Sequence, residues 1–146
     1  MKKLQNFVNG KLVDSSSGET TTLINPATGQ AFATAPNSNA ADVDKAMSAA
    51  AGAFTEWRDS TPSERQRALL KIADAIESRA DEIIAIESEN CGKPIGLTTS
   101  EEVPPMIDQI RFFAGAARNL EGKSAGEYMK GMTSFIRREP VGVCGQ

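Results

Sequence analysis

The spacing of apolar residues divides the chain into a strand-like beginning, a helical middle and a strand-like end. Near the start, Phe7-Val8 and Leu12-Val13 flank Asn9-Gly10. Asn-Gly favours the type I′ turn of a tight hairpin, so these residues predict two short antiparallel strands. The β-branched run 20–24 predicts a longer strand, and a turn rich in Pro and Gly separates it from a weaker strand at 31–35.

Four helices are predicted in the middle of the chain, where apolar residues recur every three or four positions. The first begins near Ser38. The second has a clear start signal, because Thr61 is a capping residue, Pro62 suits the first helical position and Glu64 completes a capping box. The apolar stripes expected to face a core are Val43, Met47, Ala50, Phe54 and Trp57 in the first helix, and Leu69, Ile72, Ala73 and Ile76 in the second.

The third and fourth predicted helices cover residues 81–90 and roughly 100–120. Gly92 and Pro94 are typical of the positions just beyond a helix end. In the fourth helix, the adjacent prolines at 104 and 105 fit only the first turn, since a proline in the interior removes a hydrogen bond. Its expected core stripe is Met106, Ile110, Phe113, Ala117 and Leu120.

After Gly122 the pattern becomes extended again. Residues 133–138 predict a strand, and Pro140 separates it from the short apolar run Val141-Gly142-Val143-Cys144. Such a continuous run is typical of a buried parallel strand, which needs neighbours on both sides. Strands combined with long helices therefore predict an α/β fold.

Composition indicates a globular protein of the cytoplasm. The chain is 40% hydrophobic and 24% charged, which is usual for a globular domain. Its net charge of −3 provides no basic surface for nucleic acid. No apolar run approaches the roughly 20 residues of a membrane span, and the N-terminus lacks the apolar core of a secretory signal. We therefore expect free thiols in a reducing compartment, and neither nucleic acid nor a membrane as partner.

The candidate chemistry of the chain is sparse. There is no histidine, which excludes Ser-His-Asp and Cys-His sites built from these residues alone. Cys91 lies near a predicted helix end, where the dipole disfavours a thiolate, although Lys93 offsets part of that effect. Cys144 lies in the predicted apolar strand, where a thiol stays protonated. We interpret both cysteines as structural and predict no catalytic residue.

Two further features have both a structural and a functional interpretation. Gly122-Lys123-Ser124 resembles the end of a phosphate-binding loop, but Ala117 replaces the required first glycine and the segment follows a helix, so we interpret it as a turn. The carboxylates of Glu101, Glu102 and Asp108 either stabilise a helix start and face solvent, or attract a cationic substrate. The residues alone leave both alternatives open.

Seven segments, in order and at matching spacing, resemble the beginning of the aldehyde dehydrogenase superfamily over essentially the whole chain. They are Phe7–Gly10, Ile24–Gly29, the Val43–Trp57 helix, Arg65–Ala75, Asn90–Pro94, Arg111–Gly115 and Arg138–Gln146. Within the superfamily, residues 112–118 and 124–128 are most similar to bacterial aminobutyraldehyde and betaine-aldehyde dehydrogenases.

The resemblance implies that the chain is the N-terminal part of an enzyme. The implied parts are N-terminal strands with a hairpin (1–36), a helical segment of the cofactor-binding domain (37–122), a strand segment of the oligomerisation region (123–140) and the truncated start of the first Rossmann-like strand (141–146). The implied activity oxidises an amino or quaternary-ammonium aldehyde to the acid with NAD or NADP, through a cysteine thiohemiacetal, in a homo-oligomer. Since the family's catalytic and cofactor-binding residues come later, this chain alone is expected to be inactive.

The resemblance also implies two binding sites. Leu23 and Ile24 match positions whose backbone groups help to hold a structural monovalent cation, K or Na. Asn90 stands where many members have Asp, and a neutral side chain there is expected to weaken that site. Glu102 falls near positions where some aminoaldehyde-specific members carry carboxylates at the substrate entrance, which gives the functional interpretation of the acidic residues equal weight.

An alternative function is that of a non-catalytic assembly or binding module. It would dock on another chain by adding the 141–144 strand to a sheet of its partner. An exposed apolar strand is more often an aggregation hazard than an interface, which disfavours this alternative.

Overall fold

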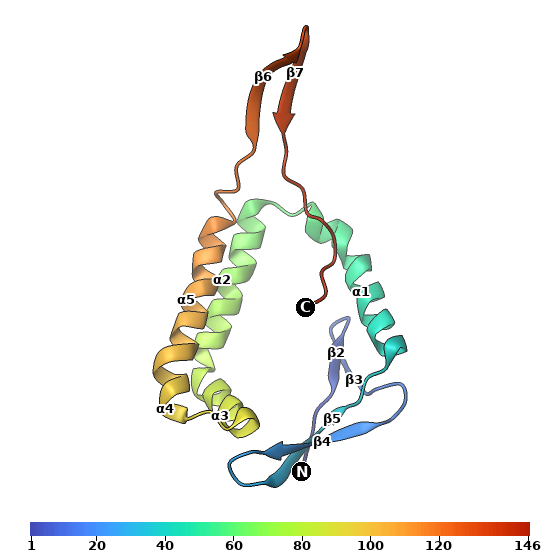
Figure 1. Ribbon diagram of the computed structural model, residues 1–146, viewed down its shortest axis with the longest axis vertical. Helices are drawn as coiled ribbons and strands as arrows, with labels where there is room; N and C mark the ends of the chain where they lie inside the picture. The colour runs from blue at the N-terminus through green and yellow to red at the C-terminus, as the bar shows by residue number, and fades with distance from the viewer.

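The N-terminal part of the chain forms two small sheets (Figure 1). The computed structural model describes residues 1–146, apart from the side chains of Ala125 and Tyr128. The strands here are β1 (Lys2–Lys3), β2 (Asn6–Val8), β3 (Lys11–Val13), β4 (Thr20–Asn25) and β5 (Gln30–Pro36). β2 and β3 form the predicted hairpin, and Asn9 and Gly10 have the positive φ values, 51° and 75°, that a type I′ turn requires. β4 and β5 pair antiparallel, whereas β1, which the sequence pattern does not indicate, joins β5 in parallel.

Four main helices confirm the predicted α/β class. They are α1 (Ala40–Arg58), α2 (Pro62–Ser78), α3 (Ala80–Cys91) and α5 (Val103–Ala116). The predicted capping box of Thr61 and Glu64 begins α2, and Gly92 ends α3 with a left-handed φ of 73°. Among the residues described, no helix is long and apolar enough to cross a membrane.

Asp42 fixes the polar loop after β3 to the start of α1. Its carboxylate accepts hydrogen bonds from the Ser15 hydroxyl and from the backbone N–H groups of Ser16 and Asn39. Burial opposes ionisation of Asp42, but the backbone N–H groups of Asn39 and Ser16 outweigh it and lower the pKa to about 2. The ionised carboxylate is therefore part of the native contact.

The predicted fourth helix differs from the sequence expectation at both ends. A short α4 (Ile95–Leu97) and a π-helical turn, η1 (Thr98–Glu102), precede α5, which ends at Ala116. Pro104 and Pro105 do lie in the first turn of α5, as predicted. The π turn ends just before these two prolines. Because a proline has no backbone N–H, the regular series of helical hydrogen bonds is interrupted at this point. Leu120 lies beyond the helix.

The apolar core lies where α2 and α5 pack side by side and α3 lies across one end of them (Figure 1). Its buried residues are Ala73, Ile84, Val103 and Ile107, with Ile76, Ile83 and Ile110 packed around them. The stripe predicted for the fourth helix is largely wrong, because α5 buries Val103, Ile107 and Ala114 while Phe113 is 57% exposed. Because α5 has apolar residues on more than one face, the spacing of its apolar residues does not identify the face that packs on α2.

Helix α1 stands apart from α2 and α5 in Figure 1. Its predicted core stripe is correspondingly exposed, as Val43, Met47 and Trp57 show. The helix itself is confirmed, whereas the burial expected for its apolar face is not observed in this chain.

A hairpin and an extended segment complete the chain. β6 (Lys123–Met129) and β7 (Met132–Ile136) form an antiparallel hairpin that projects beyond the helices (Figure 1). No strand forms over 141–144, where Val141 is 94% exposed and Cys144 is exposed. The run is exposed because no neighbouring strand among the described residues supplies the hydrogen bonds that a parallel strand requires, and its role as the start of a Rossmann-like strand stays a prediction.

Candidate functional site

Lys93 connects the end of α3 to the π turn through two ion pairs. Its Nζ lies 2.6 Å from Oε2 of Glu102 and 3.2 Å from Oε1 of Glu87, and the three side chains are partly exposed. The hydrogen bonds to Glu102 and then Glu87 raise the pKa of Lys93, while Lys93 lowers the pKa of Glu87. Glu102, the predicted substrate-entrance residue, is thus partly neutralised by a lysine.

The three predicted acidic residues have different surroundings. Glu102 is half-buried against Lys93, Glu101 is exposed on the π turn, and Asp108 lies further along in α5. A cationic group approaching this end of the helix would therefore meet Glu101 as an accessible carboxylate, with Glu102 committed to an existing ion pair. The structure leaves the substrate-entrance role a prediction.

The two thiols are both exposed. Cys91 is the last residue of α3, and its Sγ lies 2.9 Å from the carbonyl oxygen of Glu87, to which the thiol donates. Reactive cysteines usually lie at a helix N-terminus, whereas Cys91 ends its helix. Cys144 lies in the extended segment after the hairpin, with Gly142 O as its hydrogen-bond acceptor. Neither position has the environment of an activated nucleophile.

Leu23, Ile24 and Asn90 come from two elements that meet. α3 contacts β4, and the ideal Cβ position at Gly92 lies only 2.8 Å from Cγ of Pro26 in the turn after β4. The pairing of β4 with β5 shifts register between Leu23 and Ile24, which disrupts the ladder locally. No cluster of three or more His, Cys, Asp or Glu side chains able to hold a metal occurs among the described residues. A cation here would therefore depend on neutral backbone and amide oxygens.

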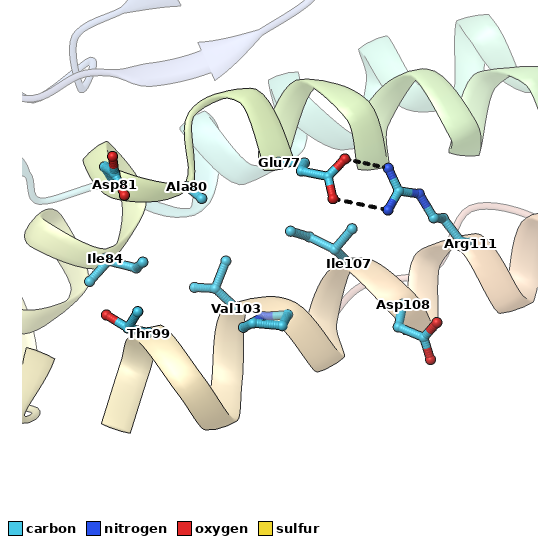
Figure 2. A pocket seen from close by; sticks show the side chains of 10 residues that line it. Glu77, Ala80, Asp81, Ile84, Thr99, Val103, Ile107, Asp108 and Arg111 are labelled. Carbon is cyan, nitrogen blue, oxygen red and sulfur yellow. Dashed lines mark hydrogen bonds and ion pairs between the residues drawn. The ribbon is translucent and has the colours of Figure 1, made fainter. Parts of the chain in front are cut away.

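A groove of about 300 Å³ opens where the end of α2, the start of α3 and the beginning of α5 meet (Figure 2). Ile84, Val103 and Ile107, each 5–7% exposed, form its apolar floor. Four charged side chains also line it: Glu77, Asp81, Asp108 and Arg111. The combination of a concave apolar floor with a few polar groups is typical of small-molecule sites.

Arg111 holds α5 to α2 at one edge of this groove. Its guanidinium donates to both carboxylate oxygens of Glu77, at 3.1 and 2.6 Å, and to Asp74 at 3.0 Å. These bonds, Glu77 first, raise the pKa of Arg111, and Arg111 lowers the pKa of Glu77. No pattern in the sequence indicates this site, because the partners of Arg111 are 34 and 37 residues away and come together only when the helices pack.

The remaining candidate, Gly122-Lys123-Ser124, leads into β6 instead of a helix. A phosphate-binding loop needs a helix N-terminus behind its glycines. The segment is therefore not a phosphate-binding loop, and the predicted turn is wrong for Lys123 and Ser124, which begin β6.

Comparison with known proteins gives consistent matches. The profile of the aldehyde dehydrogenase family matches residues 12–146. DhaS of Bacillus subtilis (strain 168) is 41% identical over 150 residues, which cover 99% of this chain and 29% of DhaS. PnpE, solved in complex with nicotinamide adenine dinucleotide, is 34% identical with a TM-score of 0.90, over 94% of this chain and 28% of PnpE.

A third match is the salicylaldehyde dehydrogenase of Pseudomonas putida G7, solved with salicylaldehyde. It is 30% identical with a TM-score of 0.90, over 97% of this chain and 29% of that enzyme. The chain therefore spans 28–29% of the length of these three relatives. Its helices and small sheets correspond to the N-terminal part of aldehyde dehydrogenase structures.

Proposed function

The chain belongs to the aldehyde dehydrogenase family, and on this premise we propose that it serves as the N-terminal part of an enzyme that oxidises an aldehyde to a carboxylic acid with NAD or NADP. The observation that carries the proposal is the family match over 12–146, together with a TM-score of 0.90 to PnpE, whose structure contains NAD. In the proposed reaction a cysteine attacks the aldehyde to form a thiohemiacetal.

We assign neither Cys91 nor Cys144 to that nucleophile. Cys91 ends a helix and donates to the backbone carbonyl and the carboxylate of Glu87, and Cys144 contacts only the carbonyl of Gly142, so neither lies at the helix N-terminus or beside the cationic group that activates a thiol. Among the residues that the structure describes, no strand leads through a glycine-rich loop into a helix, so this chain offers no pyrophosphate cradle for a dinucleotide. The residues present in this chain do not fit the cofactor.

The proposed substrates are amino or quaternary-ammonium aldehydes. Glu101 and Glu102 support this choice, because carboxylates at an entrance concentrate a cationic substrate. Lys93 weakens that support, since it already pairs with Glu102 at 2.6 Å. The salicylaldehyde dehydrogenase of Pseudomonas putida G7 is a structural relative with an aromatic aldehyde bound, so likeness of fold alone does not select the substrate.

Glu102→Gln tests the substrate class in the protein expressed from the complete reading frame. One partly exposed charge changes kcat/KM by roughly two- to fivefold. We expect such a loss for 4-aminobutyraldehyde and none for butyraldehyde, which lacks the ammonium group. Asp44→Asn in α1 is the matched control. An equal loss for both aldehydes would contradict the proposed role of Glu102.

We further propose that the backbone of Leu23 and Ile24, with Asn90, holds a monovalent cation (K or Na). The register shift at Leu23 and the contact of α3 with β4 support this site. Asn90→Asp adds a charged ligand, so it should increase the rise in melting temperature that KCl produces relative to a choline salt. Asn119→Asp is the control, and an equal response of both variants would refute the site.

We also propose a cytoplasmic homo-oligomer, a dimer or tetramer, for the complete enzyme. The β6–β7 hairpin supports an oligomer, because it projects from the helices and exposes Phe135 by 71%. Light scattering on Phe135→Asp measures the effect: a smaller assembly is expected, and an unchanged mass would count against a contact at the hairpin.

A further inference from the structure

Asn9 and Gly10 form an exposed two-residue turn between β2 and β3 (Figure 1). Val8 and Lys11 pair across this turn, and the hydrogen bond of a tight turn joins the two residues that flank its central pair. The N–H of Gly10 is therefore outside the ladder of the hairpin. Apart from its chain neighbours, nothing lies within 4 Å of the position where a Cβ of Gly10 would be. The backbone nitrogen of Gly10 is thus accessible to the side chain of Asn9.

The hairpin around this turn is weakly held. β2 and β3 form a sheet of their own with three residue pairs, and a lone two-stranded hairpin is only marginally stable in water. Its apolar side chains contribute little burial, because Phe7 is 72% and Leu12 is 65% exposed. Local opening of such an element costs little free energy, so Asn9 readily leaves the conformation that the closed turn imposes.

We propose that Asn9 is a site of spontaneous deamidation, and that one product, isoaspartate, breaks the β2–β3 hairpin. The nitrogen of Gly10 attacks Cγ of Asn9, a C–N bond forms, and the side-chain amide leaves as ammonia. Water then opens the cyclic imide at either of its carbonyl carbons, which gives aspartate or isoaspartate. The modification adds one negative charge to the net charge of −3. It needs only water and does not depend on the proposed oxidation.

The two products differ in their effect on the turn. In isoaspartate the backbone runs through the former side chain, so one additional carbon separates residue 9 from Gly10. The turn aligns Val8 with Lys11 through φ values of 51° and 75° at its two central residues, and a longer link does not fit that geometry. Aspartate keeps the original backbone, and Asp-Gly suits a type I′ turn as Asn-Gly does. The pairing of β2 with β3 is therefore expected to survive only in the aspartate product.

Incubation of the purified chain at neutral and at mildly alkaline pH tests the modification, followed by ion-exchange chromatography and peptide mass spectrometry. We expect a species with one added negative charge at residue 9, and faster formation at the higher pH, because the attacking nitrogen must lose its proton. Asn9→Gly keeps a residue that tolerates positive φ and should abolish this species. Asn119→Gly is the matched control and should leave its formation unchanged, since Asn119 is also exposed but precedes Leu120.

NMR of the separated products tests the effect on the hairpin. The cross-strand contact between Asn6 and Val13 should be retained in the aspartate form and lost in the isoaspartate form. A chain whose charge does not change, equal formation of the new species in Asn9→Gly and the unmodified sequence, or an isoaspartate form that keeps the contact of Asn6 with Val13 would overturn the proposal.

Discussion

Substituting Gly92 with alanine tests how α3 is docked on the turn between β4 and β5. Gly92 has a φ of 73°, and an added Cβ would lie 2.8 Å from Cγ of Pro26. Two separate costs follow. The left-handed backbone is unfavourable for any L-residue, and the new methyl group overlaps a ring that belongs to the opposite element.

Gly18 separates these costs. Its φ of 71° is nearly the same, but nothing lies within 4 Å of an added Cβ. The left-handed conformation costs about 1–2 kcal/mol, which is all that Gly18→Ala should lose. Overpacking against Pro26 adds about 1–3 kcal/mol, so Gly92→Ala should lower the free energy of unfolding by about 2–5 kcal/mol.

Urea denaturation followed by circular dichroism measures the difference. With a slope of about 2 kcal/mol per molar urea, the extra loss in Gly92→Ala corresponds to a midpoint about 0.5–1.5 M lower than that of Gly18→Ala. Adding Pro26→Ala to the Gly92→Ala variant removes the proline ring. A double-mutant cycle should then show that most of the extra loss of unfolding free energy is recovered. Equal midpoints for the two glycine variants, or no recovery in the cycle, would refute the docking contact.

Three further substitutions test the helical framework by the same denaturation assay. The pKa of Asp42 is lowered from 3.8 to about 2, so the stability that its ionised form contributes is present above pH ~4 and is lost as the pH falls toward 2. The difference between wild type and Asp42→Asn should shrink over that range, and a difference independent of pH would contradict the contact with Ser16. Thr61→Ala removes the cap of α2 and should cost about 1 kcal/mol, whereas Thr61→Ser should cost much less; equal losses would argue against capping. Ile107→Ala opens a cavity in the core and should cost about 2–5 kcal/mol, compared with less than about 1 kcal/mol for the exposed Ile95→Ala; similar losses would place the core elsewhere.

Local signals in the sequence predicted the elements well. Asn9-Gly10 favours its turn by local preference alone, because both residues tolerate positive φ. Thr61 and Glu64 likewise form a local capping box, in which each side chain bonds the backbone N–H of the other residue. The parallel pairing of β1 with β5 has no comparable signal. A two-residue strand is too short for a pattern, and its partner lies about thirty positions away.

Tertiary contacts determine which apolar face of a helix packs in the core and which charged side chains form ion pairs. α5 has apolar residues on two faces, and only its position beside α2 decides that Ile107 is buried and Phe113 is not. The same packing brings Arg111 to Glu77. Glu102 is the last residue of the π turn and Lys93 lies nine residues earlier, before α4, so the regular spacing of an α-helix does not predict that they are close.

The cation site and the substrate entrance remain proposals for a related reason. Leu23 and Ile24 would act through backbone oxygens, which leave no signature in the type of side chain. Glu102 would act on the charged end of a substrate, whereas the reacting aldehyde group would contact residues that do not belong to the elements described here. The resemblance to aldehyde dehydrogenases identified both positions.

Aldehyde-dependent formation of NADH or NADPH is the most direct test of the proposed function. Two proteins are compared, the 146-residue chain and the protein expressed from the complete reading frame, each with 4-aminobutyraldehyde or betaine aldehyde. We predict turnover with the acid as product for the complete protein, and none above the blank for the chain alone. Turnover by the chain alone, or a complete protein that oxidises no aldehyde with either cofactor, would contradict the proposal.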